Sequence, residues 1–290
     1  MKKVLVFGGV GFLGSYLVEE LKKRSYKITV ADILENHHVS VDFIPCDISN
    51  REEVNQIFKT NTYDIVYNLA GFANLDNAVG SPIKTIELNV VSNMYILEAC
   101  VKYNIEKFVY ASSAYAMSNK GSYYGISKLA SEKIIEEYNK IHDLQFVILR
   151  YGSVYSERKH LNNYIYNLVE NAVLEGEINH AGDGEEVREY IHAADAARLS
   201  VDVIESNEYN NIHVILTGTE RIRRVELFQM IKEILNDKVQ INLKGEHQVN
   251  HYKYTPYSFS PSVSKRLTAN PHIDMGQGLL ECIRFVNNNE

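Results

Sequence analysis

Three side chains near the middle of the chain, Ser113, Tyr124 and Lys128, have the types and spacing needed for proton transfer to or from an alcohol. Tyr124 and Lys128 are four residues apart, so they share one face if this segment is a helix. A lysine ammonium beside a phenol lowers the phenol pKa, because the positive charge favours the phenolate. Such a tyrosine exchanges a proton with an alcohol as hydride moves to or from a cofactor, while a serine hydroxyl fixes the substrate oxygen.

This tyrosine–lysine spacing is common by chance in a chain with 20 tyrosines, so the prediction depends on a site for a hydride carrier. The N-terminus offers one, because an apolar run leads into three glycines, Gly8, Gly11 and Gly14, and then into apolar residues at helical spacing. These glycines allow a tight turn, a close approach to a pyrophosphate and close packing of the helix on the strand. Phe12 and Leu13 open that helix, where unpaired backbone amides favour phosphates.

A glycine turn also serves sites that bind no dinucleotide, and Asp32 strengthens the dinucleotide interpretation. It ends a second apolar strand, 28–31, and follows Gly14 by 32 − 14 = 18 residues, close to the spacing of a ribose-binding acid. A carboxylate accepts hydrogen bonds from the ribose hydroxyls and repels a 2′-phosphate. Ile33 and Leu34 follow it and provide no arginine for that phosphate, so the sequence predicts NAD.

Two later strand ends are further candidates for the cofactor site. Asp47 and Ile48 follow the predicted strand 41–46, where the Asp47 carboxylate is placed to meet the adenine amino group or simply to stabilise a turn. The strand beginning at residue 63 ends in small residues that let the backbone pass beside the cofactor: Leu69, Ala70 and Gly71. A long helix is predicted from residue 82 to 101, and within it we interpret Asn89 as a solvated or capping amide.

Strands and helices alternate up to the sixth predicted strand, 146–150, which indicates an α/β fold with a Rossmann-type, doubly wound parallel sheet. We expect residues 1–152 to form the NAD-binding domain and residues 153–290 mainly a smaller substrate-binding domain. A segment near 188–213 is expected to return to the first domain.

Composition limits the classes of partner. The chain has 290 residues, a formal charge of −7 and a pI near 5.8, which argue against nucleic acid or an anionic membrane as main partner. The three cysteines fit neither a disulfide framework nor a zinc site, and no metal is expected. No apolar stretch is long enough to span a membrane and the N-terminus leaves no room for a signal peptide, so we expect a cytoplasmic protein.

Together the glycines, Asp32, Ser113 and the Tyr124/Lys128 pair resemble the extended short-chain dehydrogenase/reductase family, particularly its nucleotide-sugar epimerases and dehydratases. Segments 149–155 and 182–192 are similar to family segments beside the sugar and the diphosphate. The resemblance implies that Tyr124 takes the proton of the sugar C4 hydroxyl, that Ser113 orients this oxygen and that Lys128 also bonds the nicotinamide ribose. It further implies contacts to a nucleoside-diphosphate sugar from Ser153, Asn163, Arg188 and Tyr252, although the segment around Tyr252 is equally consistent with a packed loop.

The residues after Ser113 narrow the reaction. A 4,6-dehydratase of this family needs an acid and a base there, and this chain has Ala114 and Tyr115; the glutamate of a decarboxylating relative is absent too. The resemblance therefore implies a 4-keto sugar that is completed as a 4-epimer or released by a 4-dehydrogenase. The alternatives are a 4-keto-sugar reductase and a non-catalytic NAD(H)-binding sensor or scaffold.

Two further expectations follow from the resemblance. The interval from Ser113 to Tyr124, 124 − 113 = 11 residues, is shorter than usual in the family, which implies a reduced cover over the sugar. Helices 83–102 and 124–141 are those that pair across a two-fold axis in such proteins, so we expect a homodimer.

Overall fold

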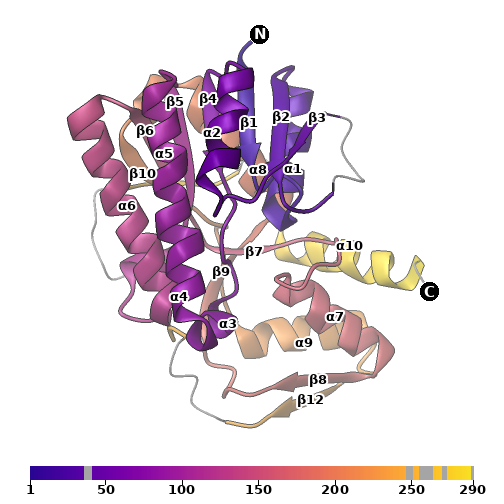
Figure 1. Ribbon diagram of the computed structural model, residues 1–290. Helices are drawn as coiled ribbons and strands as arrows, with labels where there is room; N and C mark the ends of the chain where they lie inside the picture. The colour runs from indigo at the N-terminus through magenta and orange to yellow at the C-terminus, as the bar shows by residue number, and fades with distance from the viewer. Residues whose placement is uncertain (36–40, 246–250, 255–263, 270–272, 289–290) are drawn as a thin grey trace.

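The computed structural model describes residues 1–35, 41–245, 251–254, 264–269 and 273–288. Figure 1 shows a layered body with a central sheet and helices on both faces, and below it a smaller body that holds α7, α9, β8 and β12. Helix α10 (Met275–Asn288) runs beside the junction of the two.

The central sheet has eight parallel strands in the order β13-β10-β6-β5-β4-β1-β2-β3. Their bounds are β1 Lys3–Phe7, β2 Lys27–Asp32, β3 Asp42–Pro45, β4 Ile65–Asn68, β5 Lys107–Ser113, β6 Gln145–Tyr151, β10 Ile212–Leu216 and β13 Ser264–Leu267. The chain winds outward from β1 in both directions, so the crevice at the carboxyl ends of β1 and β4 is the expected ligand position. The predicted doubly wound α/β fold is confirmed.

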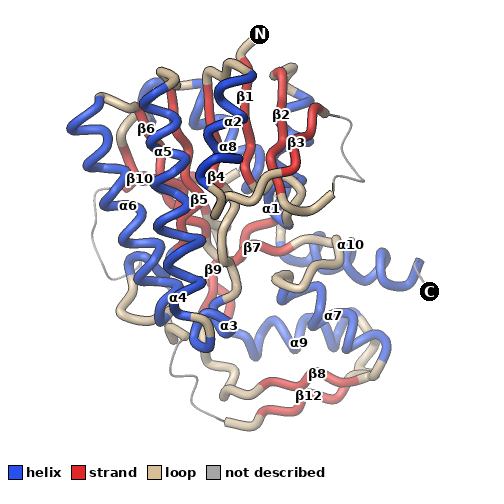
Figure 2. Tube along the Cα trace, viewed as in Figure 1, coloured by secondary structure: helices blue, strands red, loops and turns tan. Residues whose placement is uncertain are grey.

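Alternating side chains of β1 enter two separate cores. Val4 and Val6 pack on the side of α1 (Phe12–Lys23) and α8 (Ala193–Glu205), and Leu5 and Phe7 on the opposite side. That opposite side is covered by α2 (Arg51–Thr60), α5 (Ser92–Lys102) and α6 (Ser122–His142), as Figure 2 also shows. The predicted helix from residue 82 comprises α4 (Pro82–Ile86), a π-helical turn (Glu87–Val91) and α5.

The smaller body has its own core, built by α7 (Tyr164–Leu174), α9 (Arg224–Ile234) and α10. Its strands form two small sheets: β7 (Ser153–Tyr155), β9 (Val187–His192) and β11 (Arg221–Arg223) in one, and β8 (Glu177–His180) and β12 (Gln240–Leu243) in the other. The chain returns to the central sheet through α8 and β10, whereas β9 belongs to a small sheet. It returns again through β13, which we did not predict from the sequence.

The remaining short elements are α3 (Leu75–Gly80) and two 3₁₀ turns, Ala114–Met117 and Asn207–Tyr209. Among the helices of the described ranges, none has both the length and the apolar character that a membrane span requires.

Candidate active site

The glycine turn between β1 and α1 leaves no room for side chains. Gly8 has φ +77°, and a Cβ there would lie 2.6 Å from the backbone nitrogen of Ala70. A Cβ on Gly14 would collide with the Gly8 carbonyl oxygen, whereas one on Gly11 would meet only that oxygen, at 3.3 Å. Gly11 is the N-cap of α1 and provides no side-chain cap, and the first turn has no acidic residue. The amides that begin α1, at Phe12 and Leu13, are therefore suited to an anion, as predicted.

Asp32 ends β2 at the same edge of the sheet. Its carboxylate accepts hydrogen bonds from the backbone amides of Val10 at 2.9 Å and Leu34 at 3.1 Å. A carboxylate has about four acceptor positions, so two remain for the hydroxyls of a ribose. Asp32 thus also fastens the glycine turn to β2, a second role that the spacing alone did not indicate.

Two neighbouring strand ends complete this edge. The Asp47 carboxylate accepts hydrogen bonds from the Ser49 amide (2.9 Å) and hydroxyl (2.7 Å), which is the turn-stabilising role that the sequence left open, and Ile48 beside it is buried. Leu69, Ala70 and Gly71 follow β4, and Ala70 lies against Gly8. Their contact with a cofactor stays a prediction.

Ser113 and Tyr124 meet although they come from different elements. Ser113 is the last residue of β5 and Tyr124 lies in the first turn of α6. Burial raises the pKa of Tyr124, and the neighbouring Tyr252 adds to this rise. A hydrogen bond with Ser113 lowers the pKa, but the net shift is upward. Ser113 thus lies within hydrogen-bond distance of the Tyr124 hydroxyl, and its contact with a substrate oxygen stays a prediction.

Lys128 lies one turn later on α6, and its Nζ donates to the carbonyl of Ala111 at 2.8 Å. Its ammonium is 5.9 Å from the centre of the Tyr124 ring and 4.8 Å from that of Tyr110. Burial lowers the pKa of Lys128 to about 8, although the carboxylate of Glu132 acts against this shift. Burial keeps the pKa of Tyr124 raised in the protein alone, and the lowering of that pKa by Lys128 stays a prediction.

Asn89 is a positioning residue that the sequence analysis misinterpreted. It is buried on the π-helical turn, so the interpretation as a solvated amide is wrong. Its Oδ1 accepts from the Phe72 amide at 2.7 Å, and its Nδ2 donates to the Phe72 carbonyl at 3.1 Å and to the Ser127 hydroxyl at 2.9 Å. Asn89 thereby joins the loop after β4 to the helix that carries Tyr124 and Lys128.

A row of aromatic rings leads from Tyr124 to the predicted substrate residues Tyr252 and Arg188. The Tyr115 ring lies 6.2 Å from Tyr124 and 4.6 Å from Tyr252, measured between ring centres. The guanidinium carbon of Arg188 lies 4.2 Å from the Tyr252 ring centre. Burial raises the pKa of Tyr252, whereas Arg188 and a hydrogen bond with Ser153 oppose that rise. The structure therefore brings Ser153, Arg188 and Tyr252 together; residues 255–257 of the predicted aromatic stretch lie outside the described part of the chain.

Asn163 has a different role from the predicted one. It is fully buried and caps α7, with Oδ1 accepting from the Tyr166 amide at 3.3 Å. Its Nδ2 donates to the carbonyls of Ser156 (2.8 Å) and Arg158 (2.9 Å). Because this amide is engaged within the protein, Asn163 positions the loop before α7 and does not offer a free group to a nucleotide.

The site has an aromatic side chain where elimination would need a base. The Tyr115 hydroxyl lies 3.0 Å from Nδ1 of His251, whose Nε2 lies 3.1 Å from Asp76. Burial, assisted by Tyr252, raises the pKa of Tyr115 well above its usual value, against the effect of Arg188 and Arg224. A phenol with a raised pKa stays protonated near neutral pH and cannot act as the base for elimination, which agrees with the exclusion of dehydration drawn from Ala114 and Tyr115.

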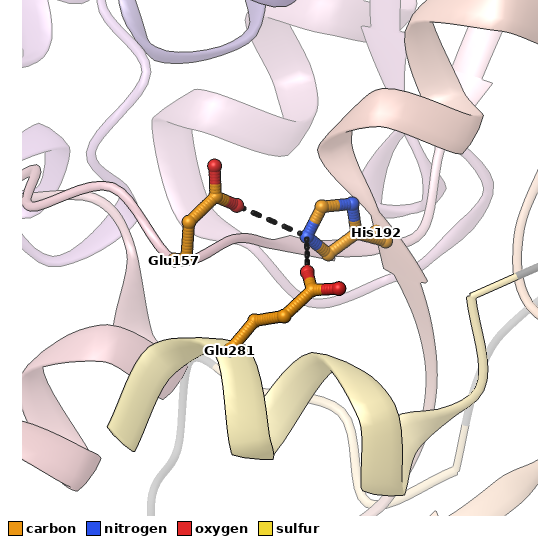
Figure 3. A group of neighbouring side chains, drawn as sticks. All are labelled: Glu157, His192 and Glu281. Atoms are coloured by element: carbon orange, nitrogen blue, oxygen red, sulfur yellow. Dashed lines mark ion pairs between the residues drawn. The ribbon is translucent and has the colours of Figure 1, made fainter. Parts of the chain in front are cut away.

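A separate cluster joins the two bodies. His192, Glu157 and Glu281 bring three possible ligand atoms within 4.8 Å of one another (Figure 3). However, Nδ1 of His192 accepts from the Ala194 amide at 3.3 Å, so the neutral imidazole carries its proton on Nε2, which faces Glu157 at 3.2 Å. A metal ligand would need Nε2 without its proton. The cluster is therefore a polar contact of His192, at the end of β9, with carboxylates from the loop after β7 and from α10.

Comparison with known proteins extends over both bodies. Residues 4–215 match the sequence profile of a family described as the NAD dependent epimerase/dehydratase family. The chain is 28% identical to a putative UDP-glucose 4-epimerase from Methanocaldococcus jannaschii over 99% of each chain. Its fold is similar to a UDP-glucose 4-epimerase from Thermotoga maritima solved with UDP-glucose, with a TM-score of 0.85, 23% identity and 99% of both chains covered. It is also similar to a UDP-glucuronic acid 4-epimerase from Bacillus cereus in complex with UDP-glucuronic acid and NAD, with a TM-score of 0.84, 22% identity and coverage of 99% of this chain and all of that one.

Proposed function

Because this chain belongs to the NAD dependent epimerase/dehydratase family, we propose that it is an NAD-dependent enzyme that oxidises the C4 hydroxyl of a nucleoside-diphosphate sugar to a ketone. The observation that carries the proposal is the convergence of Ser113, Tyr124 and Lys128 beside the carboxyl ends of β4 and β5. The glycine turn and Asp32 lie at the same edge of the sheet.

The residues at this edge fit NAD. The amides that begin α1 would hold the pyrophosphate, and Asp32 the adenosine ribose; Asp47 and Ile48 would lie near the adenine. The crowding at Gly8 and Gly14 supports this assignment, because it excludes side chains at these two positions and lets the backbone of the turn approach a pyrophosphate. Bound NAD supplies the acceptor for the C4 hydride.

The chain's own side chains perform the proton chemistry. Tyr124, as phenolate, takes the proton of the C4 hydroxyl while Ser113 orients that oxygen. Lys128 holds its ammonium one turn away and favours the charged phenolate over the phenol. In the reverse direction Tyr124 returns the proton to the C4 oxygen.

We favour completion as a 4-epimerase over release of the ketone. The relatives from Methanocaldococcus jannaschii, Thermotoga maritima and Bacillus cereus are all described as 4-epimerases. In such a reaction the keto sugar turns over and takes hydride back on its other face. The absence of an acid and a base at Ala114 and Tyr115 supports this outcome over elimination.

The test is mass spectrometry of UDP-, GDP-, CDP- and dTDP-sugars after incubation with the protein and NAD, with nicotinamide absorbance followed alongside. Unchanged mass with altered retention and no net NADH identifies an epimerase; loss of two hydrogens with NADH accumulation identifies a 4-dehydrogenase. A 4-keto-sugar reductase would oxidise NADH only when a 4-keto sugar is supplied. A sensor or scaffold would retain its biological activity in Tyr124→Phe.

We further propose a cytoplasmic homodimer. Three unpaired, buried cysteines, Cys46, Cys100 and Cys282, agree with a reducing compartment. Apolar side chains are exposed along α4, α5 and α6, including Ile83, Met94, Ile126 and Leu129. Pairing of these helices with those of a second copy would cover the exposed apolar side chains, which supports a dimer interface at this face. A monomer mass by light scattering at micromolar protein would exclude the dimer.

A further inference from the structure

One face of the antiparallel strand pair β9 and β11 bears two arginines. Arg188 lies opposite Ile222 in the antiparallel register, and the Arg224 amide donates to the Glu186 carbonyl at 3.0 Å, which extends the ladder by one residue pair. Side chains two residues apart on a strand point to the same side. Arg188 and Arg224 are therefore diagonal neighbours on one face, at a typical separation of about 7–8 Å between backbones.

Both arginines are buried without full use of their donors. Arg188 is 3% exposed and Arg224 is 9% exposed. Nη2 of Arg188, Nε of Arg224 and the hydroxyl of Tyr190, which shares their face, have no hydrogen-bond partner among the residues that the structure describes. Aromatic rings support both guanidinium groups, with carbon-to-centre distances of 4.2 Å for Arg188 on Tyr252 and 4.2 Å for Arg224 on Tyr164.

Glu186 favours the charge on Arg224 within the protein, but the unpaired donors beside it remain free within the part of the chain that the structure describes. Two neighbouring buried cations repel each other, and each unused donor has lost its contact with water. Glu186, the carboxylate residue that pairs in register with Arg224, also places both of its oxygens 3.2 Å from Nε2 of His180. The convergent free groups are all donors, which suits an acceptor such as a phosphate.

We propose that Arg224 is a second substrate-binding cation, which together with Arg188 and the Tyr190 hydroxyl holds the diphosphate of the nucleotide sugar. The inference rests on the proposed function and adds a residue from α9 to the single arginine predicted from the sequence. Arg188 is connected to Tyr124 through the rings of Tyr252 and Tyr115, so a sugar lying along that row would reach the reactive phenol.

The test compares UDP and UMP binding to the NAD-loaded protein by calorimetry. Arg224→Gln removes one of two guanidinium contacts, so the Kd for UDP should rise roughly ten- to a hundredfold, whereas UMP, with one phosphate, should change less than about threefold. Arg223→Gln is the matched control, because that neighbouring arginine is about half exposed and pairs with Glu185 and Glu226. It should leave both Kd values unchanged.

Arg224→Lys keeps the buried charge if the glutamine variant does not fold, and it should still weaken UDP more than UMP because it lacks the planar fork. Equal UDP affinity in wild type and folded variants would overturn the inference and leave the proposed reaction intact. If the Arg224 variants lose their preference for UDP over UMP while the wild type oxidises no sugar, the result would support the inference and contradict the proposed reaction. A wild type that binds none of UDP, GDP, CDP and dTDP would overturn the inference.

Discussion

The ammonium of Lys128 lies 5.9 Å from the centre of the Tyr124 ring, one helical turn along α6, and is held there by the Ala111 carbonyl at 2.8 Å. Both groups are buried, and burial shifts their pKa values in opposite directions. The pKa of Lys128 falls to about 8, while that of Tyr124 rises. The charge that favours the phenolate is consequently lost within an accessible range of pH.

The first prediction is a loss of activity above about pH 8. The fraction of charged Lys128 falls as pH rises through its pKa of about 8, and the phenolate then loses its stabilising charge. Lys128→Arg retains a cation at high pH, so the decline of kcat/KM should move upward in pH. Lys128→Met and Tyr124→Phe should each lower kcat about 10²–10⁴-fold while NAD stays bound. An identical high-pH limb in wild type and Lys128→Arg would contradict this assignment.

The second prediction concerns the glycine turn. A Cβ on Gly14 would collide with the Gly8 carbonyl, so Gly14→Ala must displace the turn that is proposed to hold the pyrophosphate. We expect weaker NAD binding by calorimetry and a free energy of unfolding lower by about 1–3 kcal/mol. Gly80→Ala is the matched control, because a Cβ there has no atom within 4 Å. Unchanged NAD affinity in Gly14→Ala would show that the glycine turn does not bind the cofactor.

The third prediction tests Asn89 as a positioning residue. Asn89→Ala leaves the Phe72 amide, the Phe72 carbonyl and the Ser127 hydroxyl without their partner, and each loss of this kind typically costs about 1–3 kcal/mol. We expect lower stability to urea and a lower kcat, because the loop after β4 separates from the helix of Tyr124. A variant that is destabilised but keeps the wild-type kcat would reduce Asn89 to a structural role.

Local sequence patterns were sufficient for the first six strands of the central sheet and for the strand ends at its carboxyl edge. Gly8, Asp32 and Ser113 each directly follow or end an apolar strand, and strands wound outward from β1 bring such ends to one edge. Local patterns therefore located, without any long-range information, the strand ends at which the cofactor and catalytic residues are predicted.

The other features depend on register between distant segments. Arg224 becomes a neighbour of Arg188 only because β11 pairs with β9 at one particular offset. Asn89 reaches Phe72 and Ser127 only through helix packing, and β13 joins β10 after a long excursion of the chain. No periodicity within a short window encodes these relationships.

The fourth prediction concerns the carboxylate behind the active site. Glu132, buried one turn after Lys128, accepts from Arg150 Nε at 2.9 Å and Nη2 at 2.6 Å, and from the Ser112 hydroxyl at 2.5 Å. Burial opposes its ionisation, but Arg150, His213 and Ser112 outweigh that effect and lower its pKa to about 2 from the usual 4.5. A depressed carboxyl pKa stabilises the fold above the unfolded-state pKa, and this contribution is lost as pH falls toward the folded-state value.

Glu132→Gln should therefore lower the free energy of unfolding by about 3–5 kcal/mol at pH 7, because Arg150 then faces a neutral amide in a buried site. Below about pH 4.5 the difference from wild type should narrow, because protonation removes the same charge from Glu132. Urea unfolding at several pH values measures this difference. Glu137→Gln removes an exposed pair with Lys140 and should cost less than about 1 kcal/mol at any pH. A constant gap between Glu132→Gln and wild type from pH 7 to pH 3 would show that the stabilisation comes from packing and not from the charge on Glu132.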